Sequence, residues 1–429
     1  MNYNQAIEYL FNLTRLGWRL GVDKILSLLN ELDNPHEKYK VVHVAGTNGK
    51  GSTSSMLASI LNAAGYNSGL FTSPHLVYVG ERIKYNNIPI NREELVDYIS
   101  RLQPLIKKYN CTFFEALTAI AMVYFADKKV DIAVIEVGLG GRLDATNVVR
   151  PVISIITNID IDHVKQLGRT RRSIASEKAG IIKPDSICIS NTKHKSAGDV
   201  FDQICKKVNV DHIQLSQLMK IDNVRLDENF TTLDLSVNGA FFPRLKIALI
   251  GEHQIENAAT AVAAATVLNS KFMPVNTQDI YNGLQNVIWP GRLQLLRSQP
   301  KIVADVAHNL NGFTVLKKAV RNIFKYDRLI MVAGFAKDKD YHAMIRKISS
   351  LVDILVAVRA DNSRSLSATV LAKAARQYIP EVKQFPRVVN GLDFAINHAQ
   401  KNDLILCTGS HFVIGEIFQI LNGGDYQKI

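Results

Sequence analysis

The stretch VVHVAGTNGKGSTSSMLASI, residues 41–60, decides the fold of this chain. Its β-branched start predicts a buried strand, its glycine-rich middle a tight loop, and its last residues a helix. A loop that joins a strand to a helix N-terminus presents backbone N–H groups to an anion. The usual phosphate loop has G-x-x-x-x-G-K followed directly by Ser or Thr, whereas Gly51 follows Lys50 here and Val44 replaces the first glycine. The pattern favours a nucleotide site, and a structural turn stays as the alternative.

The composition predicts a soluble chain of more than one domain. It has 429 residues, 47% of them apolar, which is enough for two or three hydrophobic cores. No apolar run approaches the roughly 20 residues that cross a bilayer. The start, MNYNQAIEYLFNLTRL, contains Glu8 and lacks the features of a signal peptide. We therefore expect a cytoplasmic protein that does not bind membranes.

The net charge of +12 suits polyanionic partners. The basic residues are scattered, with one short cluster at GRTRRS (168–173), and no basic stripe alternates with aromatic residues. A nucleic-acid partner is therefore not expected. The four cysteines lie far apart and form no C-x-x-C pair, which is typical of reduced, buried thiols: Cys111, Cys188, Cys205 and Cys407.

The order of predicted elements indicates an α/β fold with two domains. Residues 41–190 alternate apolar strands with helices, which is typical of a mostly parallel sheet covered by helices. Residues 221–250 alternate around Asn238-Gly239 and predict a small antiparallel patch. We predict a P-loop-type ATPase domain over residues 1–295 and a smaller Rossmann-like α/β domain over residues 296–429. In the second domain the last expected elements are a helix from residue 366, the strand DLILCTG (403–409) and a final helix.

Polar residues follow several predicted strands directly, and ligands of open parallel sheets bind at those strand ends. Glu136 ends one buried strand, and its alternative role is a buried ion pair with Arg142. Asp162 and His163 follow the next strand. Because a lone His is unusual among Mg²⁺ ligands, a simple polar strand end is an equal alternative there.

Two further stretches carry candidate residues. Lys178 lies in a predicted helix just before a proline, where a lysine is usually a solvated surface charge. In the second domain, DVAHN (305–309) repeats the polar strand end, and PGR (290–292) precedes it at the expected domain boundary. Ligand sites favour such boundaries, although plain loop polarity explains these residues equally well.

Together these stretches resemble one family, the folylpolyglutamate synthases and dihydrofolate synthases of the Mur ligase superfamily. The shared motifs occur in the family's order over nearly the whole chain: GTNGKGS, TSPHL, ERI, EVGLGGRLDATN, DH with LG, EKAGI, HQ with NAATA, PGR, DVAHN and GSHFVIGEI. In this family the shortened loop binds the ATP triphosphate. The resemblance therefore implies that residues 46–52 form an ATP site, a central Mur-ligase-type domain contains it, and the C-terminal domain is a glutamate-ligase domain.

The resemblance also implies individual roles. The ATP site comprises Gly46, Thr47, Asn48, Gly49, Lys50, Gly51, Ser52, Gln254, Asn257, Arg292 and Asp305. The magnesium ligands are Ser52, Ser73, Glu136, His163 and Lys178, with two ions expected and Lys178 carbamylated by CO₂. The catalytic residues are Lys50, Lys178 and His308, and the pterin contacts are Thr112, Phe114, Asp144 and Ala145. A requirement for a monovalent cation stays open.

The implied reaction joins L-glutamate to a folate carboxylate through an acyl phosphate. Whether dihydropteroate is also an acceptor stays open, and the enzyme is expected to be a monomer. Two alternatives remain. One is another Mur-type ligase that acts on a cell-wall nucleotide, for which the chain before residue 46 is too short to hold the usual sugar-nucleotide domain. The other is a nucleotide-dependent switch without ligase activity, which would not need a carbamylated lysine.

Overall fold

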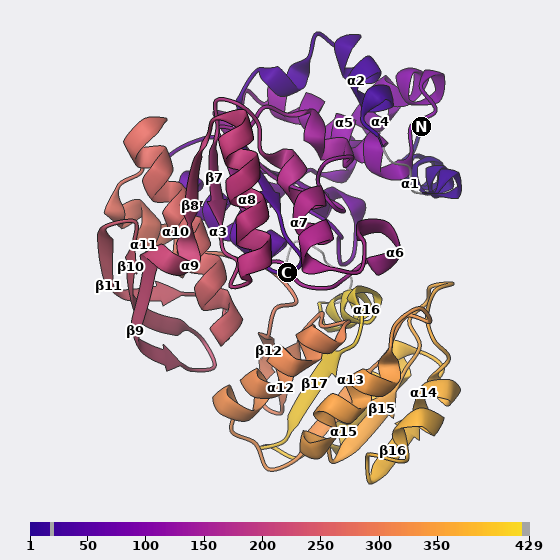
Figure 1. Cartoon of the computed structure of the whole chain (residues 1–429). Coiled ribbons are helices and arrows are strands. Elements are labelled where there is room, and N and C mark those ends of the chain that lie inside the picture. Colours follow the sequence, from indigo (N-terminus) through magenta and orange to yellow (C-terminus); the bar gives the residue numbers. More distant parts are fainter. Residues whose placement is uncertain (18–20, 423–429) are drawn as a thin grey trace.

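The computed structural model describes residues 1–17 and 21–422 and shows two α/β bodies (Figure 1). The larger body contains an eight-stranded sheet in the order β4-β3-β2-β5-β1-β6-β7-β8. The six strands β2, β5, β1, β6, β7 and β8 run parallel, and β3 pairs antiparallel with both β2 and β4. The prediction of a mostly parallel sheet is therefore confirmed. The strands are β1 Lys40–Ala45, β2 Ser68–Phe71, β3 Ile83–Tyr85, β4 Ile88–Pro89, β5 Ile132–Glu136, β6 Ile153–Ile156, β7 Ile187–Ser190 and β8 Asp211–Gln214.

Helices cover both faces of this sheet because alternate strand residues bury on opposite sides. Val42 and Val44 of β1 pack on the face of α3, α10 and α11, whereas Val41 packs on the face of α1, α2, α4 and α5. The helices are α1 Tyr3–Asn12, α2 Asp23–Asn30, α3 Lys50–Ala63, α4 Arg92–Lys108, α5 Phe113–Asp127, α6 Val164–Leu167, α7 Arg171–Lys178, α8 Lys195–Val208, α9 Leu215–Leu218, α10 Glu252–Lys271 and α11 Thr277–Gln285.

Short connections complete the larger body. The 3₁₀ helices are η1 Leu13–Leu16, η2 Pro35–Glu37, η3 Val79–Arg82, η4 Ala145–Val148 and η5 Ala179–Ile181, with η6 Ser349–Leu351 in the smaller body. A separate antiparallel sheet, β9 Met219–Leu226, β10 Thr231–Val237 and β11 Ala240–Ile247, confirms the predicted patch. Its buried residues on β10 join the same core as α3 and α10.

The smaller body is built on a six-stranded sheet in the order β12-β13-β17-β14-β15-β16, parallel except for β12. Helices α12 to α14 pack on one face, and α15 and α16 pack on the other. The elements are β12 Gln294–Ser298, β13 Lys301–Ala304, α12 Leu310–Ile323, β14 Leu329–Ala333, α13 Tyr341–Ile348, β15 Ile354–Ala357, α14 Ala368–Ala375, β16 Glu381–Gln384, α15 Val388–His398, β17 Leu404–Thr408 and α16 His411–Leu421.

Two details of this body differ from the sequence-based expectations. Strand β16 and helix α15 lie between the predicted helix near residue 366 and the predicted strand DLILCTG. The sequence of β16, EVKQ, has mostly exposed side chains because the strand lies at the sheet edge, so it shows no apolar run. The expected domain boundary between residues 295 and 296 falls within β12, which pairs with β13.

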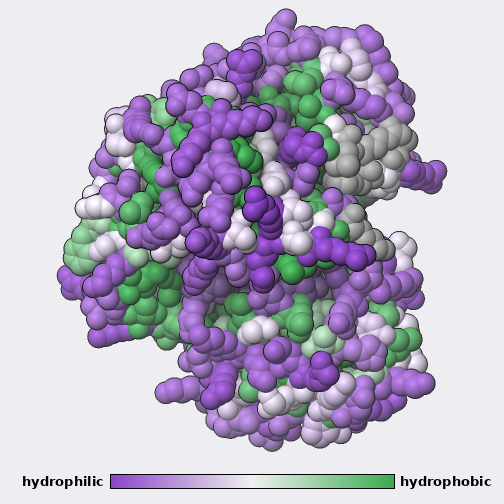
Figure 2. Space-filling model, viewed as in Figure 1, coloured by the Kyte–Doolittle hydropathy of each residue, from purple (hydrophilic) through white to green (hydrophobic). Residues whose placement is uncertain are grey.

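The surface seen in the same view is mostly hydrophilic and is hollowed where the two bodies meet (Figure 2). Among the described helices, none is both long and apolar enough to cross a membrane.

The contact between α11 and α3 gives a stability prediction. A Cβ added to Gly283 would lie 2.4 Å from the backbone Cα of Ile60, and Ser59 Oγ donates a 2.7 Å hydrogen bond to the Gly283 carbonyl. Gly283→Ala should therefore force the helices apart and lower the free energy of unfolding by about 2 kcal/mol. Chemical denaturation measures this change.

Gly198 of α8 is the matched control, because it also lies within a helix. A Cβ there would meet mainly the flexible end of Gln214, at 3.0 Å. Gly198→Ala should be neutral or slightly stabilising, since alanine favours helix over glycine. Equal unfolding free energies for the two variants would contradict the close α3–α11 packing.

Candidate active site

The glycine-rich loop lies between β1 and the first residue of α3, and its backbone requires glycine. Gly46 and Gly49 have φ of +151° and +82°. A Cβ on Gly46 would lie 1.9 Å from Thr157 Oγ1, and one on Gly49 would lie 2.2 Å from Asn257 Oδ1. Asn158 holds the loop further, since its carbonyl and Oδ1 accept from the N–H groups of residues 47 and 48 at 2.9 and 2.8 Å. The loop is therefore a rigid cradle packed between β6 and α10.

Two lysine ammonium groups converge on this loop at a single oxygen atom. Lys50 Nζ donates to the Gly46 carbonyl at 3.2 Å, and Lys178 Nζ donates to the same carbonyl at 2.8 Å. Lys178 reaches it from α7 and is buried. Burial, and to a smaller extent the positive charge of Lys50, lower the pKa of Lys178 to about 7. The alternative of a solvated surface charge is wrong for Lys178, which is a buried amine beside the loop and partly neutral at neutral pH.

Glu136, at the end of β5, faces the same loop. Its Oε2 accepts a 3.1 Å hydrogen bond from the backbone N–H of Ser73, a predicted magnesium ligand. Burial raises the pKa of Glu136, while Lys50 and the Ser73 N–H act in the opposite direction. The alternative ion pair with Arg142 is wrong, because Arg142 binds Glu177 at 2.8 Å. Glu136 is therefore a buried carboxylate held opposite Lys50.

Asp162 and His163 lie with both lysines around a small cavity of about 40 Å³. His163 adopts φ +48°, and its Nε2 lies 4.0 Å from Asp162 Oδ2. Within the described part of the chain, no three His, Cys, Asp or Glu side chains gather as a metal site. A magnesium ion here would therefore need hydroxyl, phosphate or carbamate oxygens in addition to the carboxylate, which matches the mixed set of predicted ligands.

A second cavity, of about 200 Å³, lies between the two bodies and brings most predicted ATP contacts together. It is lined by the predicted residues Asn48, Gly49, Ser52, Gln254, Asn257, Arg292, Asp305 and His308. Asn257 Nδ2 donates to Gln254 Oε1 at 2.9 Å, so these α10 side chains fix one another. The loop, α10 and the start of the smaller domain thus form one binding cavity.

Asp305 and His308 shape the wall that the smaller domain contributes. Asp305 accepts from the N–H groups of Leu293 and Ala307 at 3.0 and 2.8 Å, and burial raises its pKa against the opposing charge of Arg292. His308 Nδ1 lies 2.9 Å from the Val306 carbonyl. Because a carbonyl only accepts, Nδ1 carries the proton and Nε2 keeps a free lone pair. Burial also lowers the pKa of His308, which favours the neutral ring.

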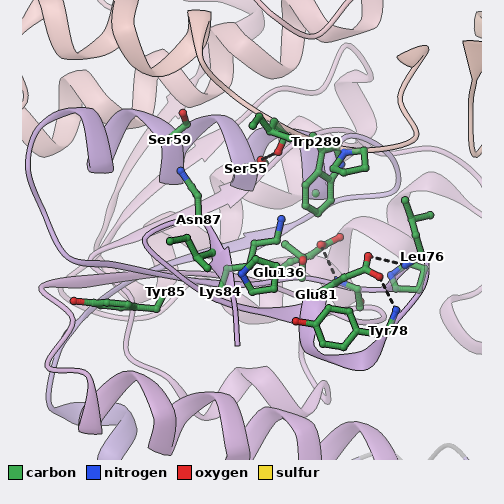
Figure 3. Close-up of a pocket in the computed structure, with 18 of the residues that line it drawn as sticks. Ser55, Ser59, Leu76, Tyr78, Glu81, Lys84, Tyr85, Asn87, Glu136 and Trp289 are labelled. Carbon is green, nitrogen blue, oxygen red and sulfur yellow. Dashed lines mark hydrogen bonds between the residues drawn. The ribbon is translucent and has the colours of Figure 1, made fainter. Parts of the chain in front are cut away.

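A third cavity, of about 850 Å³ and the largest of these three, is lined in part by Glu136 (Figure 3). Its walls are the β3–β4 hairpin, the first turns of α3 and the segment 286–292. Glu81 orders the loop at its rim by accepting from three N–H groups, those of Leu76, Val77 and Tyr78, at 2.8, 2.6 and 2.7 Å. An acceptor molecule in this cavity would meet Glu136 and Ser73 at its inner end.

The four predicted pterin contacts do not line this cavity. Thr112 caps α5, and Phe114 packs so closely on the loop after β5 that a Cβ on Gly138 would lie 2.4 Å from its ring. Asp144 accepts from the N–H groups of Leu139 and Thr146 at 2.8 and 3.0 Å. Phe114 and Asp144 both contact the loop after β5, and none of the four residues lines the 850 Å³ cavity.

Several lining residues were not predicted. Lys84 and Trp289 face each other in the largest cavity, and His411 lies 5.0 Å from His308 between ring centroids. His411 lies within the motif GSHFVIGEI, whereas Lys84 and Trp289 directly adjoin the motifs ERI and PGR, and a single residue at such a place carries no separate signal. Segment 286–293 contributes to both large cavities, and Arg292 lines both.

Comparison with known proteins defines the class. The chain matches the Mur ligase middle domain over residues 44–265 and the Mur ligase glutamate ligase domain over residues 291–411. The protein is an ATP-dependent ligase that joins a carboxylate to an amine, as predicted.

The relatives narrow the class to one family. The chain is 32% identical to the dihydrofolate synthase/folylpolyglutamate synthase of Bacillus subtilis, over 97% of this chain and 98% of that one. It is 32% identical to the folylpolyglutamate synthase of Lacticaseibacillus casei, over 99% and 100%. The chain belongs to the folylpolyglutamate synthase/dihydrofolate synthase family, so the predicted family is confirmed.

Solved structures agree. The Mycobacterium tuberculosis folylpolyglutamate synthase complexed with ADP superposes with a TM-score of 0.89 at 28% identity, over 98% of this chain and 99% of that one. Escherichia coli FolC in complex with DHPP and ADP superposes with a TM-score of 0.88 at 28% identity, over 97% and 98%. Both relatives bind a nucleotide, in keeping with the ATP site predicted here.

Proposed function

We propose that this enzyme ligates L-glutamate to the carboxylate of a folate, using ATP, and that dihydropteroate serves as a second acceptor. One observation carries the proposal. Lys50, Glu136 and Lys178 meet at the glycine-rich loop, between a cavity lined by the predicted ATP contacts and a larger cavity that ends at Glu136. This is the arrangement needed to bring a γ-phosphate and an acceptor carboxylate together.

The residues present fit a magnesium ion bound with the nucleotide. Glu136 offers a buried carboxylate whose Oε1 accepts no hydrogen bond from the described residues, and Ser52 adds a buried hydroxyl at the start of α3. Ser73, His163 and the carbamate of Lys178 would complete the two expected sites. When bound, magnesium neutralises charge on the phosphate oxygens.

Carbamylation of Lys178 follows from its position. With a pKa of about 7, a large share of its amine is neutral at neutral pH and can attack CO₂. A new N–C bond forms and a proton is released, so the group changes from a cation to an anion with two oxygen atoms. This change removes the repulsion between Lys178 and Lys50 and supplies oxygen ligands beside the loop.

The residues then serve two successive steps. In the first, an oxygen of the acceptor carboxylate attacks the γ-phosphorus and ADP leaves, while Lys50 and the loop hold the phosphates in line. In the second, the α-amine of glutamate attacks the acyl carbon, inorganic phosphate leaves and the amine loses a proton. His308 presents a free Nε2 lone pair to the same cavity wall and is suited to accept that proton.

Release of ADP by the purified protein tests the proposal. With ATP, Mg²⁺ and L-glutamate present, ADP should appear only after a folate acceptor is added, and tetrahydrofolate and dihydropteroate are compared as acceptors. ADP release that depends on neither glutamate nor the acceptor would favour the nucleotide switch. Stimulation only by a sugar nucleotide would favour another Mur-type ligase.

A further inference from the structure

Lys84 is a buried lysine that forms no ion pair among the described residues; burial lowers its pKa, and the carboxylate of Glu81 only partly counteracts this shift. It lies in β3 on the wall of the 850 Å³ cavity and is 9% exposed. Among residues 1–17 and 21–422 its Nζ makes no hydrogen bond or ion pair, and its contact is with the Trp289 ring, 5.1 Å from the centroid. A buried charge of this kind is costly unless an opposite charge is supplied.

The other charged groups near Lys84 already have partners. Glu81 accepts from three backbone N–H groups, and Lys128, the other lysine on the cavity wall, binds Glu94 at 2.7 Å. Glu136 accepts from Ser73 and faces Lys50. The indole N–H of Trp289 is also buried and has no acceptor in the described chain. This wall therefore offers a positive charge to whatever molecule fills the cavity.

Lys84 lies one aromatic ring away from the reactive end of the cavity. A Cβ on Gly51 would lie 2.6 Å from the Trp289 ring and 3.4 Å from Glu136 Oε2, so Trp289 separates Lys84 from the start of α3. In Figure 3, Trp289 lies above Lys84 and Glu136. An anionic group bound to Lys84 would thus lie close to the acceptor carboxylate that is phosphorylated, which sits beside Glu136.

Resting on the proposed function, we propose that Lys84 binds the α-carboxylate of the glutamyl residue whose γ-carboxylate is activated. A folate that already carries glutamate has both carboxylates, separated by a short aliphatic chain. Dihydropteroate has only the benzoate carboxylate that reacts. Lys84 therefore selects glutamate-bearing acceptors and shifts the enzyme towards chain extension.

Paired substrates and variants test this role. KM and kcat are measured for tetrahydropteroyl monoglutamate and for its α-carboxamide analogue, with wild type, Lys84→Met and Lys84→Arg. A buried charge-assisted pair should make the wild-type KM at least about tenfold lower for the carboxylate than for the carboxamide. Lys84→Met, which keeps the length of the side chain, should abolish this discrimination without changing the KM for ATP. Lys84→Arg should retain it.

The outcomes separate the two proposals. A wild type that treats both acceptors alike, or a Lys84→Met enzyme that still discriminates as wild type does, would overturn the role of Lys84. An equal loss with both acceptors would show that Lys84 only supports the fold of the cavity. If wild type releases no ADP with either acceptor and glutamate, the ligase proposal itself fails, and the role of Lys84 fails with it.

Discussion

Replacing Lys50 by alanine is expected to lower kcat by about 1,000-fold, because a preorganised positive charge at the transferring phosphoryl group is lost. Lys50 lies at the start of α3 and donates to Gly46, and among the charges that lower the pKa of Glu136 it has the largest effect. The measurement is glutamate-dependent ADP release at saturating ATP.

Lys271→Ala is the matched control for this variant. Lys271 is exposed at the end of α10 and pairs with Asp211 at 3.0 Å, far in sequence from the loop. It should keep wild-type kcat. Near-normal turnover by Lys50→Ala, with thermal unfolding like that of wild type, would refute the role of Lys50 in phosphoryl transfer.

The second large effect is expected at Lys178. Lys178→Ala should lower kcat by about 100-fold, because a group that supplies oxygen ligands to the metal site is removed. Millimolar formate or acetate should restore part of the activity by placing a carboxylate in the space left. The exposed Lys207 of α8, changed to alanine, should behave like wild type.

Labelling with ¹³CO₂ tests the carbamate directly. The pKa of Lys178 is lowered to about 7, so the neutral, reactive amine predominates above that pH and the ammonium predominates below it. The carbamate signal in wild type should therefore fall as the pH drops below about 7 and be absent in Lys178→Ala. A signal unchanged by the substitution would assign the carbamate to another lysine.

The sequence predicted best those site residues that directly follow parallel strands. Strands β5, β1 and β6 are neighbours in the sheet, so Glu136, the loop at Gly46 and Thr157 meet at one edge. That meeting depends only on strand order and the alternation of helices. The roles assigned to those residues stay predictions, although the geometry brings most of them together.

The sequence predicted least well those features that depend on contacts between distant segments. Lys84 and Trp289 are 205 positions apart and meet only when the β3–β4 hairpin packs beside the connection between the domains. The predicted pterin contacts illustrate the same limit. Thr112 caps α5, whereas Asp144 caps η4 and holds the loop after β5.

Segment 286–293 connects the two domains and lines both large cavities, with Arg292 exposed to each. If a ligand in one cavity orders this segment, its binding free energy includes the loss of conformational entropy. A ligand in the other cavity then binds without that unfavourable contribution. Nucleotide and acceptor should therefore bind synergistically, each lowering the dissociation constant of the other by the same factor. With such coupling, the short connection would link the two sites, and both would fill readily only when nucleotide and acceptor are present together.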